Sequence, residues 1–152
     1  MKLSRKGIYG IRALIDLAIQ SSVSGDADSS WLQISGIAER TQISEKFLEQ
    51  ILLVLKKNGV LKSRRGAVGG YALARPASHI RMDELLRILD AQLDPENEIE
   101  TGAEGGGEAL RRLVRRAEEA SMEVLASKTL EDLARETRDW QDVRPGGIEF
   151  QI

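Results

Sequence analysis

The stretch from residue 34 to residue 76 constrains the fold most, because it joins two amphipathic helices through a very short turn. In the first helix, apolar residues recur at helical spacing, at Ile34, Ile37 and Ala38. Residues 41–43 then leave room only for a sharp turn. Ser44 can cap the second helix with its hydroxyl, and Glu45 suits the positive end of the helix dipole. We therefore expect a helix-turn-helix unit.

The second helix is expected to end at Asn58-Gly59, a common C-terminal stop. Its apolar positions form one stripe, made of Phe47, Leu48, Ile51, Leu52 and Leu55. The polar residues left on the outside are Glu45, Lys46, Glu49, Gln50 and Lys57. Residues 60–64 and 71–74 then read as two strands, joined by a turn with three glycines and closed by Pro76. The predicted fold class is mainly α with a small β wing, which is a winged helix-turn-helix domain.

This layout suits double-stranded DNA as a partner. A helix is about 10–12 Å across, which fits the major groove of B-DNA. On this hypothesis the second helix meets base edges through Ser44, Lys46, Glu49 and Gln50. The hairpin adds the cations Lys62, Arg64 and Arg65. Gly66 and Gly69 let its backbone approach a phosphate or a narrow minor groove. The alternative is a helix and hairpin that only pack, with their charges in solvent.

A helix is also expected from about Arg5 to Gln20, capped by Ser4. Its core face consists of Ile8, Ile11, Leu14, Ile15, Ala18 and Ile19. Backbone donors and the positive dipole at its N-terminal end can receive a DNA phosphate. The residues placed there are Ser4, Lys6 and Tyr9. The alternative is a helix start that is simply solvated.

Composition divides the chain into a basic and an acidic half. Residues 1–75 contain 12 Lys and Arg against 6 Asp and Glu, a net charge of +6, whereas residues 76–152 contain 10 against 18, a net charge of −8. Only the first half is therefore suited to a polyanion. The first expected part is a DNA-binding domain at residues 1–76. Residues 77–107 contain a short helix (82–89) and an acidic, glycine-rich linker. A dimerisation helix and a following helix occupy residues 108–137, and residues 138–152 form a tail. Residues 21–30 read as a loop, and residues 31–34 as a short strand that could join the wing.

The helix from Glu108 to Ser127 is the expected dimerisation element. Its apolar strip would leave a large exposed patch on a monomer, and consists of Leu110, Leu113, Val114, Ala117 and Leu125. Four arginines between residues 111 and 116 precede Glu118, Glu119 and Glu123, so two antiparallel copies can pair opposite charges. Thr129 is expected to cap a last helix ending at residue 137, with Asp132 completing a capping box. Residues 138–147 read as irregular.

Several kinds of chemistry are excluded. The chain has no cysteine, so it offers no disulfide, thiolate metal site or thiol redox chemistry. It shows no catalytic Ser/His/Asp or Cys/His set, and His79 is its single histidine. We therefore expect no enzyme, no metal and no cofactor. There is no run of about 18 apolar residues and no signal peptide, so a cytoplasmic protein without membrane contact is expected.

Three motifs, in order, resemble the Rrf2 family of bacterial winged-helix transcription regulators. They are MKLSRKGIYGIRALIDLA at residues 1–18, ISEKFLEQIL at 43–52 and RGAVGGYALARP at 65–76. The resemblance implies a homodimeric, sequence-specific DNA-binding repressor. Two copies of the second helix would enter successive major grooves, which predicts a pseudo-palindromic operator.

Family members that bind an iron-sulfur cluster carry three cysteines in the loop matching residues 94–107 and at the next helix start. This chain has none there, and its Asp and Glu are hard ligands unsuited to such a cluster. Either this branch never used a cluster, or Ala103 and Ala109 replace cysteines of an iron-sulfur or redox-responsive regulator. A third hypothesis, favoured by the acidic second half, is a protein-interaction module that has lost DNA binding.

The C-terminal part resembles the cluster-free branch of the family, which represses genes of cysteine metabolism. The resemblance rests on TLEDLA at residues 129–134 and on the ending Phe150-Gln151-Ile152. It implies cysteine synthase (O-acetylserine thiol-lyase) as a partner, with the Ile152 carboxylate captured in the amino-acid substrate site and Phe150 beside it. The alternative is a tail that folds back as an edge strand, because Ile148, Phe150 and Ile152 would share one face.

Overall fold

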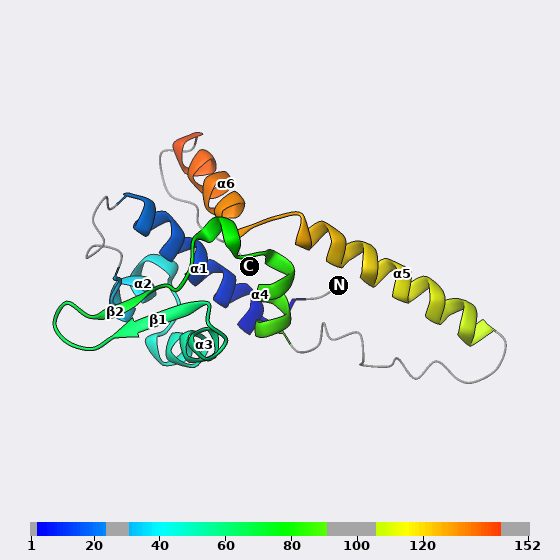
Figure 1. The fold of residues 1–152 in the computed structure, drawn as a ribbon, viewed down its shortest axis with the longest axis horizontal. Coiled ribbons are helices and arrows are strands. Elements are labelled where there is room, and N and C mark those ends of the chain that lie inside the picture. Colours follow the sequence, from blue (N-terminus) through cyan, green and yellow to red (C-terminus); the bar gives the residue numbers. More distant parts are fainter. Residues whose placement is uncertain (1–2, 24–30, 91–105, 144–152) are drawn as a thin grey trace.

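Helix α1, Arg5–Val23, contacts α2, α3, α4, α6 and β2 in the computed structural model of the chain. The structure describes residues 3–23, 31–90 and 106–143. Figure 1 shows α1 within the body, α3 and the sheet below it, α6 above it and α5 projecting as an arm. The other elements are α2 (Ile34–Thr41), α3 (Glu45–Lys57), β1 (Leu61–Arg64), β2 (Gly70–Leu73), the 3-10 helix η1 (Ala77–His79), α4 (Met82–Leu89), α5 (Gly106–Ala126) and α6 (Leu130–Val143). The predicted fold class is confirmed.

Small residues on α1 let its neighbours approach closely. Its buried residues are Gly7, Gly10, Ala13, Leu14, Leu17 and Ala18. A Cβ atom on Gly10 would lie only 2.6 Å from Cδ1 of Leu89, so α4 packs against α1 where glycine leaves room for it. The buried core extends from α1 into α3 and α4, where Leu48, Ile51, Leu52, Leu55 and Leu85 are fully enclosed.

Buried Asp90, at the end of α4, holds the start of α1. Its Oδ2 accepts a hydrogen bond of 2.6 Å from the backbone N–H of Ser4. Ser4 in turn caps α1, because its Oγ accepts the N–H of Gly7 at 3.0 Å, as the sequence predicts. Since Asp90 is 3% exposed, it places a largely desolvated carboxylate at the positive end of the α1 dipole.

The wing, which we define as residues 61–73, is a two-stranded antiparallel sheet in which Leu61 lies opposite Leu73 and Arg64 opposite Gly70. The predicted third strand at residues 31–34 is reduced to one bridge. Leu32 and Tyr71 exchange backbone hydrogen bonds of 2.9 and 2.8 Å. The strand cannot continue, because α2 already begins at Ile34.

Two helices differ from prediction at their ends. α1 continues to Val23, past the predicted end at Gln20, and the hydroxyls of Ser21 and Ser22 donate to the carbonyls of Ala18 and Ile19 in the preceding turn. α5 begins at Gly106, within the predicted linker, and ends at Ala126, so its first two residues are helical despite being glycine. The predicted loop at 21–30 is wrong for residues 21–23, which are helical, and its remaining residues, 24–30, lie outside the described residues. Residues 91–105 and the tail from residue 144 also lie outside them.

Helix α6 runs to Val143, so the prediction of irregular chain is wrong for residues 138–143. No glycine or proline interrupts the segment before Pro145. Arg138 also donates a hydrogen bond of 2.7 Å to Oγ of Ser22, which ties α6 to the end of α1. Long-range packing therefore extends the helix beyond its local sequence signal.

The predicted capping box at the start of α6 is confirmed. The N–H of Thr129 donates to the Asp132 carboxylate at 2.9 Å, and the N–H of Asp132 donates to the Thr129 hydroxyl at 3.2 Å. The backbone N–H and the hydroxyl of Thr129 both donate to the Asp132 carboxylate, and with Arg135 they hold the pKa of Asp132 below its ordinary value.

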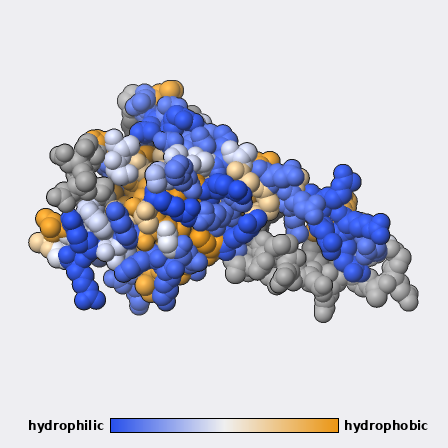
Figure 2. Space-filling model, viewed as in Figure 1, coloured by the Kyte–Doolittle hydropathy of each residue, from blue (hydrophilic) through white to orange (hydrophobic). Residues whose placement is uncertain are grey.

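Helix α5 projects from the body. After it, the chain returns to the body at residues 128–130, which form backbone hydrogen bonds with residues 80–82. The N–H of Met82 donates to the carbonyl of Lys128 at 2.9 Å, and that of Leu130 to the carbonyl of Ile80 at 2.8 Å. Leu130 is fully buried, so it anchors α6. By contrast, α5 has no buried residue. Figure 2 shows mainly hydrophilic residues over the arm on the visible face. None of the helices within the described ranges is long and apolar enough to cross a membrane.

Asp90→Ala should destabilise the protein by about 1–3 kcal/mol, because it leaves the Ser4 N–H without its acceptor and removes a charge favourable to the α1 dipole. Urea unfolding at neutral pH measures the change. The control is Asp139→Ala on the exposed side of α6, expected to stay within about 0.5 kcal/mol. Equal effects of the two variants would contradict the role of Asp90.

Candidate nucleic-acid interface

The turn between α2 and α3 depends on Gln42, which has a left-handed backbone with φ of 56°. The backbone N–H groups of Gln42 and Ile43 both donate to the carbonyl of Ala38. Arg12 on α1 donates to the carbonyl of Thr41 at 2.6 Å, so α1 holds the turn in place. The two helices are therefore held at a set angle before α3 begins.

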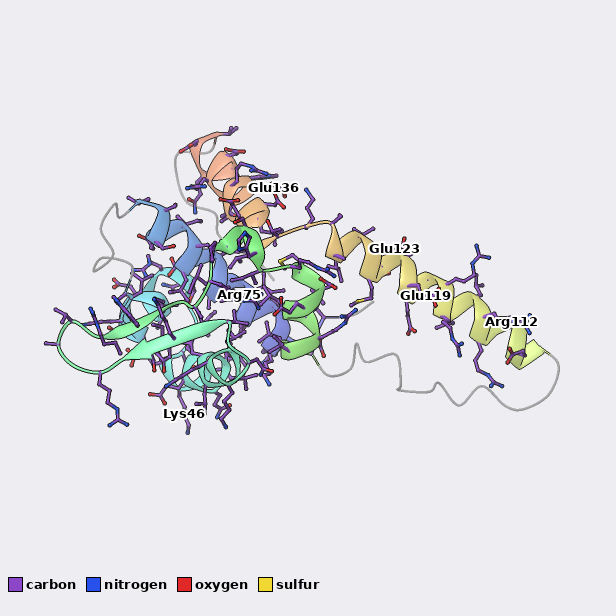
Figure 3. The ribbon with its side chains drawn as sticks, in the orientation of Figure 1. Lys46, Arg75, Arg112, Glu119, Glu123 and Glu136 are labelled. Atoms are coloured by element: carbon purple, nitrogen blue, oxygen red, sulfur yellow. The ribbon has the colours of Figure 1, made fainter. Side chains whose placement is uncertain are left out.

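Helix α3 separates an enclosed side from a free side. Ser44 caps it as predicted, since its Oγ accepts the N–H of Phe47, although at a long 3.4 Å. Its inner residues are all fully buried, and are Leu48, Ile51, Leu52 and Leu55. The exposed residues opposite form what we call the outer face, which is Lys46, Glu49, Gln50 and Leu53. Figure 3 shows Lys46 pointing away from the body, below α3.

The start of α1 lies beside α3. Tyr9 packs edge to face on Phe47, with ring centroids 5.6 Å apart, and the Arg12 guanidinium lies 5.6 Å from the centroid of the Tyr9 ring. The backbone N–H of Ser4 donates to the Asp90 carboxylate. This N–H is one of the donors that we expected to bind a DNA phosphate, and it is already occupied. The Ser4 hydroxyl can still donate its proton, and Lys6 is half-buried. DNA contacts by Ser4, Lys6 and Tyr9 stay predictions.

Glycines shape the turn of the wing. Gly66 has φ of 110°, in the region that favours glycine, and its carbonyl accepts the N–H of Gly69 at 3.0 Å. A Cβ on Gly69 would lie 2.2 Å from the carbonyl oxygen of Arg64, and one on Gly70 would lie 2.3 Å from that of Leu32. The turn thus admits no side chain at these two positions without rearrangement.

The cations of the wing have different surroundings. Trp31 lies beneath Lys62 and Arg64, whose charged groups are 5.2 and 4.7 Å from the centroid of its ring. Arg64 also donates to the carbonyl of Val68 at 2.7 Å, which closes the turn. Arg65 is exposed, as is Lys62. Arg64 therefore supports the wing, while Arg65 and Lys62 present charge to solvent.

Sequence reasoning missed several residues of this surface. Residues 31–34 were predicted to lie beside the wing as a strand, but the side chains of Trp31 and Gln33 were given no part in this surface. Their partners lie in the wing, and Gln33 donates to the carbonyl of Ala67 at 3.1 Å. Val68, at the tip, is 76% exposed, and the far-left edge of Figure 2, where the wing ends, is hydrophobic. Leu53 did have a signal, since it falls between the polar positions of α3 and outside the apolar stripe.

A family of known proteins matches most of the chain. The family described as Rrf2, iron-dependent transcriptional regulator, matches residues 3–136. The HTH-type transcriptional regulator CymR of Bacillus subtilis is 37% identical over 142 residues, which cover 93% of this chain and 96% of CymR.

Solved structures show the same fold. The structure of CymR, described as the global cysteine regulator of B. subtilis, matches with a TM-score of 0.74 at 34% identity, covering 90% of this chain and 98% of that one. The structure of T. potens IscR matches with a TM-score of 0.72 at 33% identity, covering 93% and 91%.

Proposed function

From the premise that the chain belongs to the Rrf2 family of transcriptional regulators, which are not enzymes, we propose that it is a homodimeric repressor of a pseudo-palindromic DNA operator. The main support is α3, which is fully buried on one side and carries exposed hydrogen-bonding groups on the other, beside a basic wing. Gln50 can bond adenine in a bidentate manner, and Glu49 can accept from cytosine N4. Two copies of α3 would read half-sites about 34 Å apart.

Genes of cysteine metabolism are the regulon that we propose. The support is the likeness to CymR, which spans nearly the whole of both chains and whose solved structure is described as that of a global cysteine regulator. A regulator of transcription acts where the DNA is, so a cytoplasmic location belongs to the same proposal.

The iron dependence in the family description does not fit the residues of this chain. An iron-sulfur cluster is held by thiolates, and the sequence contains no cysteine. Within residues 3–23, 31–90 and 106–143, no three His, Asp or Glu side chains come together in a way that could hold a metal ion. Ala109 is exposed near the start of α5, while Ala103 lies outside the described residues.

Dimerisation through α5 is part of the proposal. Leu110 is 50% and Leu113 65% exposed on the arm, as expected for an apolar strip that a second copy covers. Ala117 is exposed and Val114 half-buried, whereas Leu125 packs partly against the core of its own chain. Figure 3 shows Arg112, Glu119 and Glu123 spaced along the arm, where charges of both signs can face an antiparallel copy.

Arg65→Ala should weaken binding to all DNA sequences and flatten its salt dependence. Each lost phosphate contact reduces the slope of log K against log salt by about 0.9, hence by about 1.8 for a dimer. Fluorescence anisotropy from about 50 to 200 mM salt measures it. The control is Arg135→Ala on α6, which lies across α1 from α3. If the slope for Arg65→Ala equals that of the wild type, Arg65 does not contact a phosphate. If the wild type itself binds no DNA at low salt, the result supports an interaction module instead.

Leu113→Glu combined with Ala117→Glu should give monomers with much weaker operator binding, because four carboxylates would be buried in the proposed interface. Sedimentation measures the oligomeric state. Arg135→Glu is the control, since it changes the net charge by the same two units away from the arm. A dimer that persists in the double variant would refute the α5 interface.

We also propose that Phe150 and Ile152, which lie outside the described residues, bind cysteine synthase. Deleting Ile152 should abolish binding of the purified enzyme in a pull-down and leave the dimer stable in sedimentation, whereas Gln151→Ala should bind normally. A destabilised dimer would favour the folded-back strand, and enzyme binding that survives the deletion would sink the proposal.

A further inference from the structure

Leu53 is an apolar residue that the core does not use. The inner side of α3 is completed by Leu48, Ile51, Leu52 and Leu55, each with no exposed area. Phe47 is partly buried against Tyr9. Leu53 lies on the opposite side and is 49% exposed, so its side chain contributes little to the packing of the body.

The position of Leu53 on α3 is central to the outer face. Because an α-helix turns by about 100° per residue, Leu53 projects between Glu49 and Gln50. Lys46 precedes it by two turns and Lys57 follows it by about one turn on the same side. An exposed leucine therefore lies among the residues that are best placed to meet base edges in a major groove.

The chemistry of the major groove gives such a residue a specific partner. The four base pairs present hydrogen-bond donors and acceptors there, to which Lys, Glu and Gln are suited. The C5-methyl of thymine is the apolar group that these pairs offer, and apolar side chains recognise it by contact. Leu53 thus supplies what its polar neighbours lack.

We propose that Leu53 reads the C5-methyl group of one thymine in each half-site of the operator. The inference rests on the proposed DNA binding and deepens it by naming a base and the atom that is recognised. Leu53 lies about 4.5–6 Å further along the α3 axis than Gln50 and Glu49, at about 1.5 Å per residue. Base pairs are about 3.4 Å apart, so the thymine should lie one or two pairs from the base that Gln50 or Glu49 contacts.

Deoxyuridine provides the test, because it pairs as thymine does and lacks only the methyl group. Operator fragments would first be selected from genomic DNA with the full-length protein. Each thymine is then replaced singly by deoxyuridine, and Kd is measured by fluorescence anisotropy. Loss of one buried methyl contact corresponds to about a fourfold rise in Kd, or about fifteenfold when both half-sites are changed. We expect one symmetric pair of positions to show this effect.

Leu53→Ala should bind the thymine and deoxyuridine operators equally at those positions, with a Kd near that of the wild type on deoxyuridine. Val54→Ala, the same kind of truncation one residue away on a half-buried position, should keep the difference. Circular dichroism checks that both variants fold.

The other outcomes are separable. If the wild type binds its operator and no deoxyuridine matters, or if the difference persists in Leu53→Ala, the Leu53 proposal is overturned and DNA binding stands. If Leu53→Ala weakens both operators in the same proportion, Leu53 contacts the sugar-phosphate backbone instead, which also overturns it. Failure of the wild type to bind any DNA at low salt would remove the proposed function together with this inference.

Discussion

Close packing on a single helix is the constraint on which the rest of the structure depends. Because Gly10 has no side chain, Leu89 can sit against the backbone of α1, and Asp90 then reaches the N–H of Ser4. The same helix holds the α2–α3 turn through Arg12 and receives Arg138 of α6 through Ser22. α1 is therefore a common support for the face that we propose for DNA and for the elements that lead into the arm.

Features set by neighbours in sequence could be predicted, and features set by distant partners could not. The caps at Ser44 and Thr129 and the inner stripe of α3 follow from residues three or four positions apart, so their pattern is visible in the chain. By contrast, the bond between Ser4 and Asp90 spans 86 positions. The same holds for the last turns of α6, where contact with α1 extends a helix whose local signal had faded.

The candidate site shows the same division. Charge and turn composition indicated a basic wing, but the sequence does not show that Trp31 lies against the Arg64 side chain. Arg64 is the last residue of β1 and lies over Trp31, whereas Arg65 begins the turn and is exposed. Trp31 is held there by the backbone bridge between Leu32 and Tyr71, which joins residues far apart in the chain. Leu53 was overlooked for a different reason, because a search for apolar stripes gives no weight to an apolar residue on the polar side.

The freedom of α5 from the core has an evolutionary consequence. Substitutions in α1 or α3 must preserve packing, whereas no residue of α5 is buried and Leu125, near its C-terminal end, packs only partly against the core. Folding therefore places little restriction on the rest of the arm. With dimerisation proposed on the arm, selection acts there through the choice of partner rather than through stability. After a gene duplication, the two regulators can keep the same body while their α5 helices diverge. Such divergence is enough to prevent mixed dimers between them.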